Sequence, residues 1–497
     1  MSLDTVSYWA KSAPGREYPS GPDMECDVVV AGGGIVGVTT ALLLAREGAS
    51  VALLEARRIG SGATGYTTAK LSSLHGLTYA DLTSKLGEDT ARAYGEANEE
   101  GLAQAARLVE ELGIECDLRR KPNLTYTEDE SHTSKLSDEA GAAKQLGLPA
   151  SFVTEAPDLP FEIAAAVRFG DQAEFHPLHY LHALAEAAAE AGCAVHERSR
   201  VVSVDQGDPC TVHTEDGATL KAGHVVIATH LPILDRGLYF ARSHPERSYV
   251  LLARLRSETP QGMYLSDESP AHSLRSVPTP DGDLLMAGGE SHKVGQSDEA
   301  ERYRALEAWT QERFDVESVE HRWAAQDHMP ADMLPFVGPL WPFSDRVLTA
   351  TGMRKWGLAM GTTAAAMLSD EVQGRENRFA RTFTPVRANP VAAAPSLAKE
   401  NANVGFRFVR DRLQRGSADD LALGEGAVVG DRLGQRAVYR DEAGKLHELT
   451  ARCTHLGCIV RFNDGERSWD CPCHGSRFGI DGEVLEGPAV HPLRPAG

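Results

Sequence analysis

The sequence predicts an α/β domain with a parallel sheet, a middle part that contains both helices and strands, and a small domain of short strands at the C-terminal end. Near the N-terminus, an apolar run rich in β-branched residues, 26–31, passes directly into a glycine-rich turn and a helical stretch, 38–47. Such a run is typical of a strand buried on both faces of a parallel sheet. Near the C-terminus, short predicted strands surround two loops that contain cysteine and histidine. The length of 497 residues exceeds one ordinary core and favours about two to four domains.

The glycine-rich turn has the spacing of a dinucleotide-binding motif. Gly32, Gly34 and Gly37 follow the first strand, and a second predicted strand, 50–54, ends at Glu55. Glycine at these positions permits the tight turn, the close approach of the backbone to a pyrophosphate and the packing of helix on strand. An acidic side chain after the second strand can bind a ribose hydroxyl. Strand, turn, helix and acid together predict a bound dinucleotide.

Later segments resemble the D-amino-acid oxidase, glycine oxidase and sarcosine oxidase family, in the order in which that family has them. The small-residue loop 57–70 resembles the flavin-contacting segment, 200–204 the strand that packs on adenine, and 225–229 the strand that returns to the nucleotide domain. Residues 352–357 resemble the turn before a helix that faces the flavin pyrimidine ring. The resemblance implies an FAD-binding Rossmann-like domain. Because 352–357 has no Cys and 60–68 has no His for covalent attachment, the FAD is expected to be non-covalent.

The resemblance also implies a set of cofactor-binding residues at the matching positions. They are Gly32, Gly34, Ile35, Val36, Gly37, Glu55, Ala56, Thr67, Thr68, Ala69, Val201, Thr229, Gly352, Lys355, Trp356 and Gly357. Three side chains are candidate catalytic residues. Lys355 could place positive charge near the flavin or a substrate carboxylate, His75 could contact the ring or the substrate, and Arg275 could clamp a carboxylate. Surface solvation of Lys355 and a purely structural role for His75 are the alternatives.

Two loops near the C-terminus have the ligand spacing of a metal centre. Cys453 and His455 are followed, after fifteen intervening positions, by Cys471 and His474. Two thiolates and two neutral imidazoles can hold a [2Fe-2S] cluster, in which the imidazoles raise the reduction potential to roughly −150 to +300 mV. The same ligand set suits tetrahedral zinc. The Cys-x-His and Cys-x-x-His pairs, each followed by glycine, fit two short loops over a dinuclear cluster better than a zinc finger.

Both loops resemble the Rieske family beyond the four ligands. The resemblance implies that Cys458 and Cys473, which are not ligands, form a disulfide that ties the loops together. It also implies that Ser476 donates its hydroxyl to a cluster sulfur. Phe478 stands where the family usually has a second hydroxyl donor. We therefore expect a reduction potential below that of the Rieske proteins of respiratory complexes.

The expected domain organisation follows from both resemblances. Residues 1–375 form the FAD-dependent oxidoreductase region, in which an α+β substrate domain interrupts the nucleotide domain, and an all-β Rieske domain follows a linker. The nucleotide domain is expected at about 24–80, 195–235 and 335–375, the linker at 376–403 and the Rieske domain at 404–497. From composition and pattern, helices are predicted at 91–113, 178–191 and 299–313, and strands at 248–256 and 283–288. The glycine-rich run 424–430 is interpreted as a turn of the Rieske domain.

Composition restricts the partners. The net charge of −21 argues against binding to nucleic acid through a general field. No apolar run is long enough to predict insertion into a membrane, and residues 1–21 lack the pattern of a signal peptide, so a cytoplasmic location is expected.

The expected function is that of a dehydrogenase. A small-molecule amine, amino acid or N-alkyl derivative would reduce FAD, and the Rieske cluster would pass the electrons singly to an external one-electron carrier. Sarcosine-type relatives have a substrate-binding Lys where this chain has Ala359, so small amino acids held in that manner are not expected. Two alternatives stay open. An external ferredoxin-like donor could reduce the Rieske domain and then FAD for a reductive or oxygen-activating reaction, or the protein could be a non-catalytic redox sensor or electron-transfer adaptor.

Overall fold

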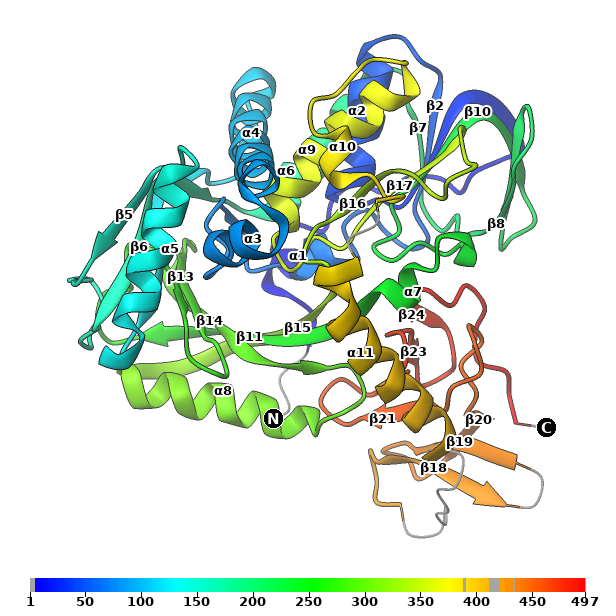
Figure 1. Cartoon of the computed structure of the whole chain (residues 1–497). Helices are drawn as coiled ribbons and strands as arrows, with labels where there is room; N and C mark the ends of the chain where they lie inside the picture. Colours follow the sequence, from blue (N-terminus) through cyan, green and yellow to red (C-terminus); the bar gives the residue numbers. More distant parts are fainter. Residues whose placement is uncertain (1–4, 388–389, 411–420, 432–433, 497) are drawn as a thin grey trace.

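The computed structural model describes residues 5–387, 390–410, 421–431 and 434–496 (Figure 1). A mixed sheet with the strand order β16-β17-β10-β1-β2-β7 contains the glycine motif, and β9 and β8 extend it beside β10. Strands β17, β10, β1, β2 and β7 pair in parallel, so that Val30 lies between Val226 and Leu53. The strands are β1 (Met24–Ala31), β2 (Val51–Leu54), β7 (Ala194–His196), β8 (Val201–Asp205), β9 (Cys210–Thr214), β10 (Thr219–Ile227), β16 (Phe336–Pro339) and β17 (Val347–Thr351).

Three helices pack against this sheet. Helix α2 (Ile35–Arg46) contacts both α6 (Pro177–Glu190) and α9 (Gly357–Val372). Helix α9 is crossed closely by α4 (Glu88–Leu112), because Gly101 has no Cβ to collide with the carbonyl oxygen of Ala359. The buried parallel strands and the first of these helices therefore have the arrangement that the glycine motif predicts.

A second mixed sheet forms the inserted domain, with the order β15-β11-β14-β13-β12-β4-β6-β3 and with β5 beside β6. Side chains of β11 alternate between two cores, since Val250 and Leu252 belong to one and Tyr249, Leu251 and Ala253 to the other. The strands are β3 (Lys70–Leu71), β4 (Arg119–Thr127), β5 (Ala150–Val153), β6 (Ala165–Glu174), β11 (Ser243–Leu255), β12 (Met263–Ser266), β13 (Ser273–Val277), β14 (Leu284–Lys293) and β15 (Val316–Pro330). Its helices are α3 (Tyr79–Leu86), α5 (Thr133–Gln145) and α8 (Glu299–Arg313).

The C-terminal part contains antiparallel sheets, one of the order β18-β19-β20 and one of the order β21-β22-β23-β24. Trp469, Phe478 and the cysteines of the two loops form its core. The run 424–430, predicted to be a turn, is mostly strand β18, so that interpretation was wrong for most of its length. The strands are β18 (Gly426–Asp431), β19 (Gly434–Arg440), β20 (Leu446–Thr450), β21 (Arg461–Asn463), β22 (Ser468–Asp470), β23 (Arg477–Gly479) and β24 (Val484–Glu486).

The segment predicted as a linker, 376–403, contains helix α10 (Ala380–Phe383) and most of α11 (Pro390–Arg410), and its residues 388–389 lie outside the described part. Helix α11 runs from the oxidoreductase region to the C-terminal strands (Figure 1). Shorter elements elsewhere are α1 (Tyr8–Ser12), α7 (Tyr239–Arg242) and the 3-10 helices η1 (Ala63–Tyr66), η2 (Glu130–His132) and η3 (Asp235–Gly237). Within the described residues, no helix combines the length and the apolar character needed to cross a bilayer.

Buried polar contacts fix the C-terminal strands against the inserted sheet. Arg247 of β11 is 1% exposed and forms an ion pair with Glu466. Glu466 also pairs with Arg477, whose Nε lies 3.0 Å from Asp470 Oδ1. Breaking one partner of such a buried network costs several kcal/mol, typically about 3–5, because it leaves an unpaired charge. The two regions therefore meet at a specific interface.

Candidate functional site

The glycine turn has the geometry of a dinucleotide cradle. Gly32 has a φ of +115°, and a Cβ at Gly37 would lie 1.9 Å from the carbonyl oxygen of Gly32. The Glu55 carboxylate accepts hydrogen bonds from the backbone N–H groups of Gly33, at 2.7 Å, and of Arg57, at 2.8 Å. Glu55 thus holds the turn and the end of β2 in register, in addition to its predicted contact with a ribose.

A cavity of about 510 Å³ begins at this turn and continues between the two large sheets, a volume typical of cofactor sites. Of the predicted cofactor-binding residues, all but Gly37 and Ala69 line it. Gly37 instead packs on the turn itself, and the carbonyl of Ala69 accepts a hydrogen bond from Arg275. A backbone cradle that a Cβ would fill, at the first turn of α2, suits the pyrophosphate of FAD.

Lys355 lines the cavity, and its position is fixed from both sides. Its backbone N–H donates to the Asp327 carboxylate, and its Nζ lies 2.8 Å from Ser291 Oγ and 2.9 Å from Glu246 Oε2. Burial alone would raise the pKa of Glu246, but hydrogen bonds from His244 and Lys355 and their charges hold it well below its usual range. Lys355 therefore brings a positive charge to the cavity wall that Glu246 partly balances.

His75 also lines the cavity, but both of its ring nitrogens are engaged. Nε2 donates to the carbonyl of Ser72 at 2.7 Å, and the Tyr94 hydroxyl donates to Nδ1 at 2.6 Å. Burial lowers the pKa of His75 to about 3, so the ring is neutral. Its face stacks on Trp356, with ring centroids 4.4 Å apart. The ring can shape the cavity and support Trp356, which fits the structural alternative.

Arg275 has a different position from the one expected. It is 1% exposed and is not among the described residues that line the cavity. Its guanidinium donates to the carbonyls of Thr68, Ala69 and Phe175, and its Nε lies 3.2 Å from Glu174 Oε2. A carboxylate clamp for substrate does not fit this placement, because the donors are already used to hold the flavin loop. The same placement gives Arg275 a role in positioning that loop.

A histidine–carboxylate group at the cavity was not predicted from the sequence. The ring of His230 lies between Asp327 Oδ1, at 3.0 Å, and Glu486 Oε1, at 2.9 Å, and all three residues line the cavity. Although burial alone would lower the pKa of His230, hydrogen bonds to Asp327 and Glu486 raise it to about 10. His230 follows β10, Asp327 is on β15 and Glu486 ends β24, so an imidazolium joins three regions of the chain.

Lys70 is a further cavity residue that sequence reasoning did not single out. Its Nζ donates to the carbonyl of Tyr264. Burial and the nearby Arg275 lower the pKa of Lys70 to about 7. In the sequence, only its position at the end of the small-residue loop could have indicated a role for Lys70. That position does not predict that the side chain is buried at β3.

The cluster loops bring the four predicted ligands together. Cys453 and Cys471 are 3% and 1% exposed, and the rings of His455 and His474 are 5.1 Å apart. The buried Nδ1 of His474 has no hydrogen-bond partner among the described residues. His455 directs Nε2 to Asp235, at 2.9 Å, which leaves Nδ1 to bind iron. Two buried thiols and two imidazole nitrogens of this kind are the donor set that a [2Fe-2S] cluster of the Rieske type needs.

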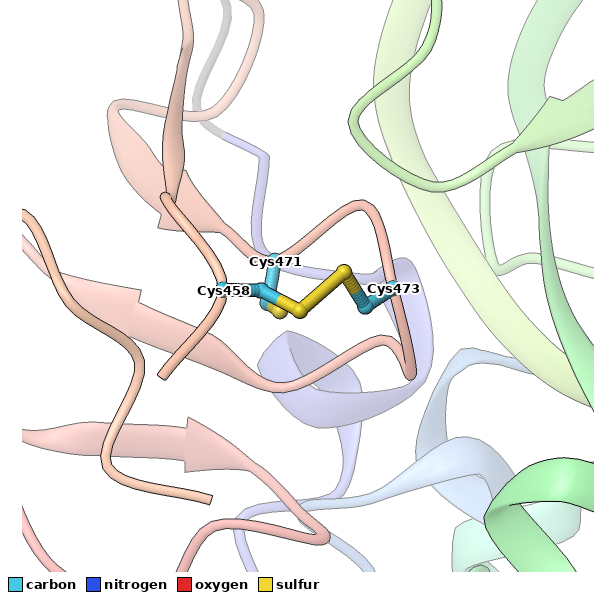
Figure 2. A group of neighbouring side chains, drawn as sticks. All are labelled: Cys458, Cys471 and Cys473. Atoms are coloured by element: carbon cyan, nitrogen blue, oxygen red, sulfur yellow. A yellow bond between two sulfur atoms is a disulfide. The ribbon is translucent and has the colours of Figure 1, made fainter. Parts of the chain in front are cut away.

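The implied disulfide between Cys458 and Cys473 is present, with Cα atoms 6.5 Å apart. Figure 2 shows it beside Cys471, which stays a free thiol. These three cysteines are close enough to suggest a metal site of their own, but the disulfide removes two of the thiols. The Ser476 hydroxyl lies within hydrogen-bonding reach of Cys453, as a donor to the cluster's sulfur atoms should.

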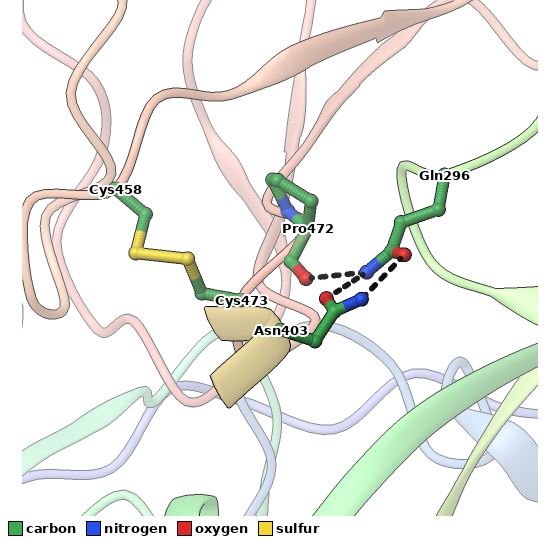
Figure 3. Close-up of a disulfide and its surroundings, with 5 residues drawn as sticks. All are labelled: Gln296, Asn403, Cys458, Pro472 and Cys473. Carbon is green, nitrogen blue, oxygen red and sulfur yellow. Dashed lines mark hydrogen bonds between the residues drawn. A yellow bond between two sulfur atoms is a disulfide. The ribbon is translucent and has the colours of Figure 1, made fainter. Parts of the chain in front are cut away.

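The second cluster loop is also held from the oxidoreductase side. The side chain of Gln296 donates to the carbonyl of Pro472 at 3.3 Å and to Asn403 of α11 at 3.0 Å (Figure 3). Gln326 of β15 donates to the carbonyl of Gly475 at 2.8 Å. The loop that holds two of the ligands therefore rests on the inserted sheet.

Comparison with known proteins supports both sites. The family model of FAD dependent oxidoreductases (DAO) matches residues 27–371, more than half of the chain, and the model of the Rieske [2Fe-2S] domain matches residues 413–496. YhfW of Bacillus subtilis (strain 168), named as a Rieske 2Fe-2S iron-sulfur protein, is 36% identical over 493 residues, which cover 98% of this chain and 97% of the relative.

Two further relatives match the oxidoreductase region. Gamma-glutamylputrescine oxidoreductase of Escherichia coli (strain K12) is 25% identical over 435 residues, 83% of this chain and 100% of that protein. Glycine oxidase from Geobacillus kaustophilus shares the fold, with a TM-score of 0.59 at 23% identity over 73% of this chain and 99% of the other. The chain therefore belongs to the DAO family of FAD-dependent oxidoreductases, binds FAD, and has a C-terminal Rieske domain that binds a [2Fe-2S] cluster.

Proposed function

We propose that this protein is a cytoplasmic dehydrogenase that oxidises a C–N bond of an amine, amino acid or N-alkyl derivative and delivers the electrons to an external one-electron carrier. When bound, FAD supplies a two-electron acceptor and the Rieske cluster a one-electron relay. One observation supports this proposal above all. The cavity that begins at the glycine turn is also lined by residues 485–487, 489 and 490 of the Rieske domain, so one wall of the flavin site belongs to the electron-transfer domain.

The substrate class is proposed from two sources. Gamma-glutamylputrescine oxidoreductase, which aligns along its whole length, is named for an amine derivative. In this chain, Lys70 lines the same cavity, and with a pKa of about 7 its amine is uncharged in a good fraction of molecules at neutral pH. We propose that it accepts a proton from the substrate's ammonium group, because an amine must lose that proton before its C–N bond can be oxidised.

Positive charge elsewhere on the cavity wall suits a substrate with a carboxylate. Arg354 and Lys355 both line the cavity and both have left-handed backbones, with φ of +53° and +71°. That conformation is costly for residues other than glycine, and it persists where the surroundings hold it. Here the contacts of Lys355 with Asp327 and Glu246 hold it. These two cations are proposed to bind the carboxylate of an amino-acid-like substrate.

The proposal is tested under anaerobic conditions with pooled amines and N-methyl amino acids. Flavin absorbance and the low-temperature EPR signal of the reduced cluster are followed together. Loss of flavin absorbance with the appearance of the EPR signal is the expected result, after which the pool is divided to identify the substrate. Bleaching of the flavin with a silent cluster would contradict the relay, and no reduction of either centre would contradict the substrate class.

A variant tests whether Lys70 accepts the proton of the substrate. The variant Lys70→Met keeps an unbranched side chain but removes the titrating amine. Wild type is expected to show a rise in the rate of flavin reduction as the pH passes through about 7, and the variant is expected to keep bound FAD and to lose this rise. An unchanged pH profile in this variant would exclude Lys70 as the proton acceptor.

A further inference from the structure

The imidazole edge of the cluster site faces the oxidoreductase region. Asp235 Oδ1 accepts a hydrogen bond from Nε2 of His455 at 2.9 Å. The ring of Phe240 packs edge-on against both ligand histidines, with centroids 5.3 Å from His455 and 4.9 Å from His474. Both cluster imidazoles therefore contact a segment that lies more than 200 residues earlier in the chain.

The same short segment reaches the flavin cavity. It begins at His230, which lines the cavity, and ends at Phe240, which contacts both ligand rings. Between them, Asp235 opens η3, and its carbonyl accepts the backbone N–H of Leu238 at 2.9 Å. This turn fixes the backbone of Asp235 and so helps to position its carboxylate. The ligand ring it contacts is nearly buried, with a His455 side chain that is 6% exposed.

We propose that Asp235 is a positioning residue for the cluster ligand His455 and that it lowers the reduction potential of the cluster. A carboxylate that accepts the outer N–H of a ligating imidazole fixes the ring and makes it a more basic ligand. It also places a negative charge beside the cluster. Both effects stabilise the oxidised cluster more than the reduced one, which has an additional negative charge. This inference needs the bound cluster, but neither the substrate nor the direction of electron flow of the proposed function.

The hydrogen bond between Asp235 and His455 joins two different regions of the chain. Asp235 belongs to the oxidoreductase region and His455 to the Rieske domain, so the hydrogen bond exists only while the two regions are docked. Separate contacts maintain that docking, including Arg247 with Glu466 and His230 with Glu486. Asp235 can therefore be changed while the interface keeps its other ion pairs.

The test is a redox titration of the full-length holoprotein, followed by the EPR signal of the reduced cluster at one fixed pH. Asp235→Asn keeps the size of the side chain and removes its charge, and an upward shift of the cluster potential is expected. Asp81→Asn is the matched control, because Asp81 pairs only with Lys85 on the surface of α3 among its described ion pairs. Equal potentials for Asp235→Asn and Asp81→Asn would overturn the proposal.

Two more variants separate tuning of the ligand from loss of docking. Asp235→Glu retains the carboxylate and is expected to shift the potential less than Asp235→Asn. Glu486→Gln weakens a different contact between the same two regions without touching a ligand. It is expected to leave the cluster potential closer to wild type than Asp235→Asn does. A shift in Glu486→Gln as large as that in Asp235→Asn would mean that docking, and not the hydrogen bond to His455, sets the potential, and would overturn the proposal.

Discussion

The two cofactor sites are built in opposite ways. All four cluster ligands lie within residues 453–474, on two loops that a disulfide joins. The flavin cavity is lined by residues from Ala31 to Val490, which come from both large sheets and from the Rieske domain. A local site can be recognised from spacing alone, whereas a cavity assembled over the whole chain depends on how the domains meet. The two sites meet where His230 and Glu486 form an ion pair.

The largest effect is expected from a change at the local site. Cys471→Ser removes a thiolate ligand, so the EPR signal of the reduced cluster should be lost entirely. Because the cluster ligands do not line the flavin cavity, the FAD absorbance should stay. Cys26→Ser, at a free cysteine of β1, is the matched control and should retain both cofactors. Simultaneous loss of FAD from Cys471→Ser would show that the two sites do not form independently.

At the flavin site, the sharpest test is a substitution of Gly37, the glycine of the turn with the least room for a Cβ atom. Gly37→Ala would push a Cβ to 1.9 Å from the carbonyl oxygen of Gly32. Relief of such overpacking costs about 1–3 kcal/mol, which corresponds to roughly fivefold to 150-fold weaker binding of FAD. Gly141→Ala on α5, where a Cβ meets no neighbouring group among the described residues, should bind FAD like wild type. The measurement is titration of apoprotein with FAD, and equal affinities would contradict the cradle.

The stability that the His230 ion pairs provide between the two sites should depend on pH. The pKa of His230 is raised to about 10, so its ion pairs stabilise the folded state fully below about pH 6.5 and less as the pH rises towards 10. His230→Gln should therefore lower the free energy of unfolding by about 1–3 kcal/mol at pH 6 and by less at pH 10. Urea unfolding of both proteins at the two pH values measures this difference. A difference that grows with pH would contradict a charged His230.

The smallest expected effect concerns a single hydrogen bond at the cluster. The Ser476 hydroxyl lies near Cys453, and Ser476→Ala should lower the cluster potential, because a donor to the sulfur atoms stabilises the reduced cluster. A neutral hydrogen bond contributes about 0.5–1.5 kcal/mol, or roughly 20–65 mV for a one-electron couple. An unchanged potential in an EPR-monitored titration would show that Ser476 only binds the backbone of Ala489, which donates to it at 3.0 Å.

The fold could be predicted where local pattern decides structure. Helix α8 occupies 299–313 as composition predicted, and the strand–turn–helix at 24–46 follows from β-branched residues and glycine spacing. The run 424–430 was predicted wrongly as a turn, because glycine usually disfavours strands. In the structure, β18 is stabilised by full pairing with β19, a tertiary contact that outweighs propensity.

The two cofactor sites could be predicted less completely than the fold, because many of their contacts join residues that are distant in sequence. The ligands and the glycines are defined by spacing within short segments. Arg275, by contrast, was considered as a carboxylate clamp because it lies between predicted strands of the substrate domain. Its ion pair with Glu174 could not be predicted, because the two residues are distant in sequence. The contact of Asp235 with His455 spans 220 residues and two domains. No periodicity in the sequence indicates such a pair.

The most direct test of the proposed relay is whether electrons pass between the two sites within one molecule. The flavin of the anaerobic full-length protein would be photoreduced with a light flash in the presence of a sacrificial electron donor, and the EPR or visible signal of the reduced cluster followed in time at several protein concentrations. We expect the cluster to be reduced with a rate constant that does not depend on protein concentration. A rate that rises in proportion to concentration, or a cluster that stays oxidised while the flavin is reduced, would contradict it.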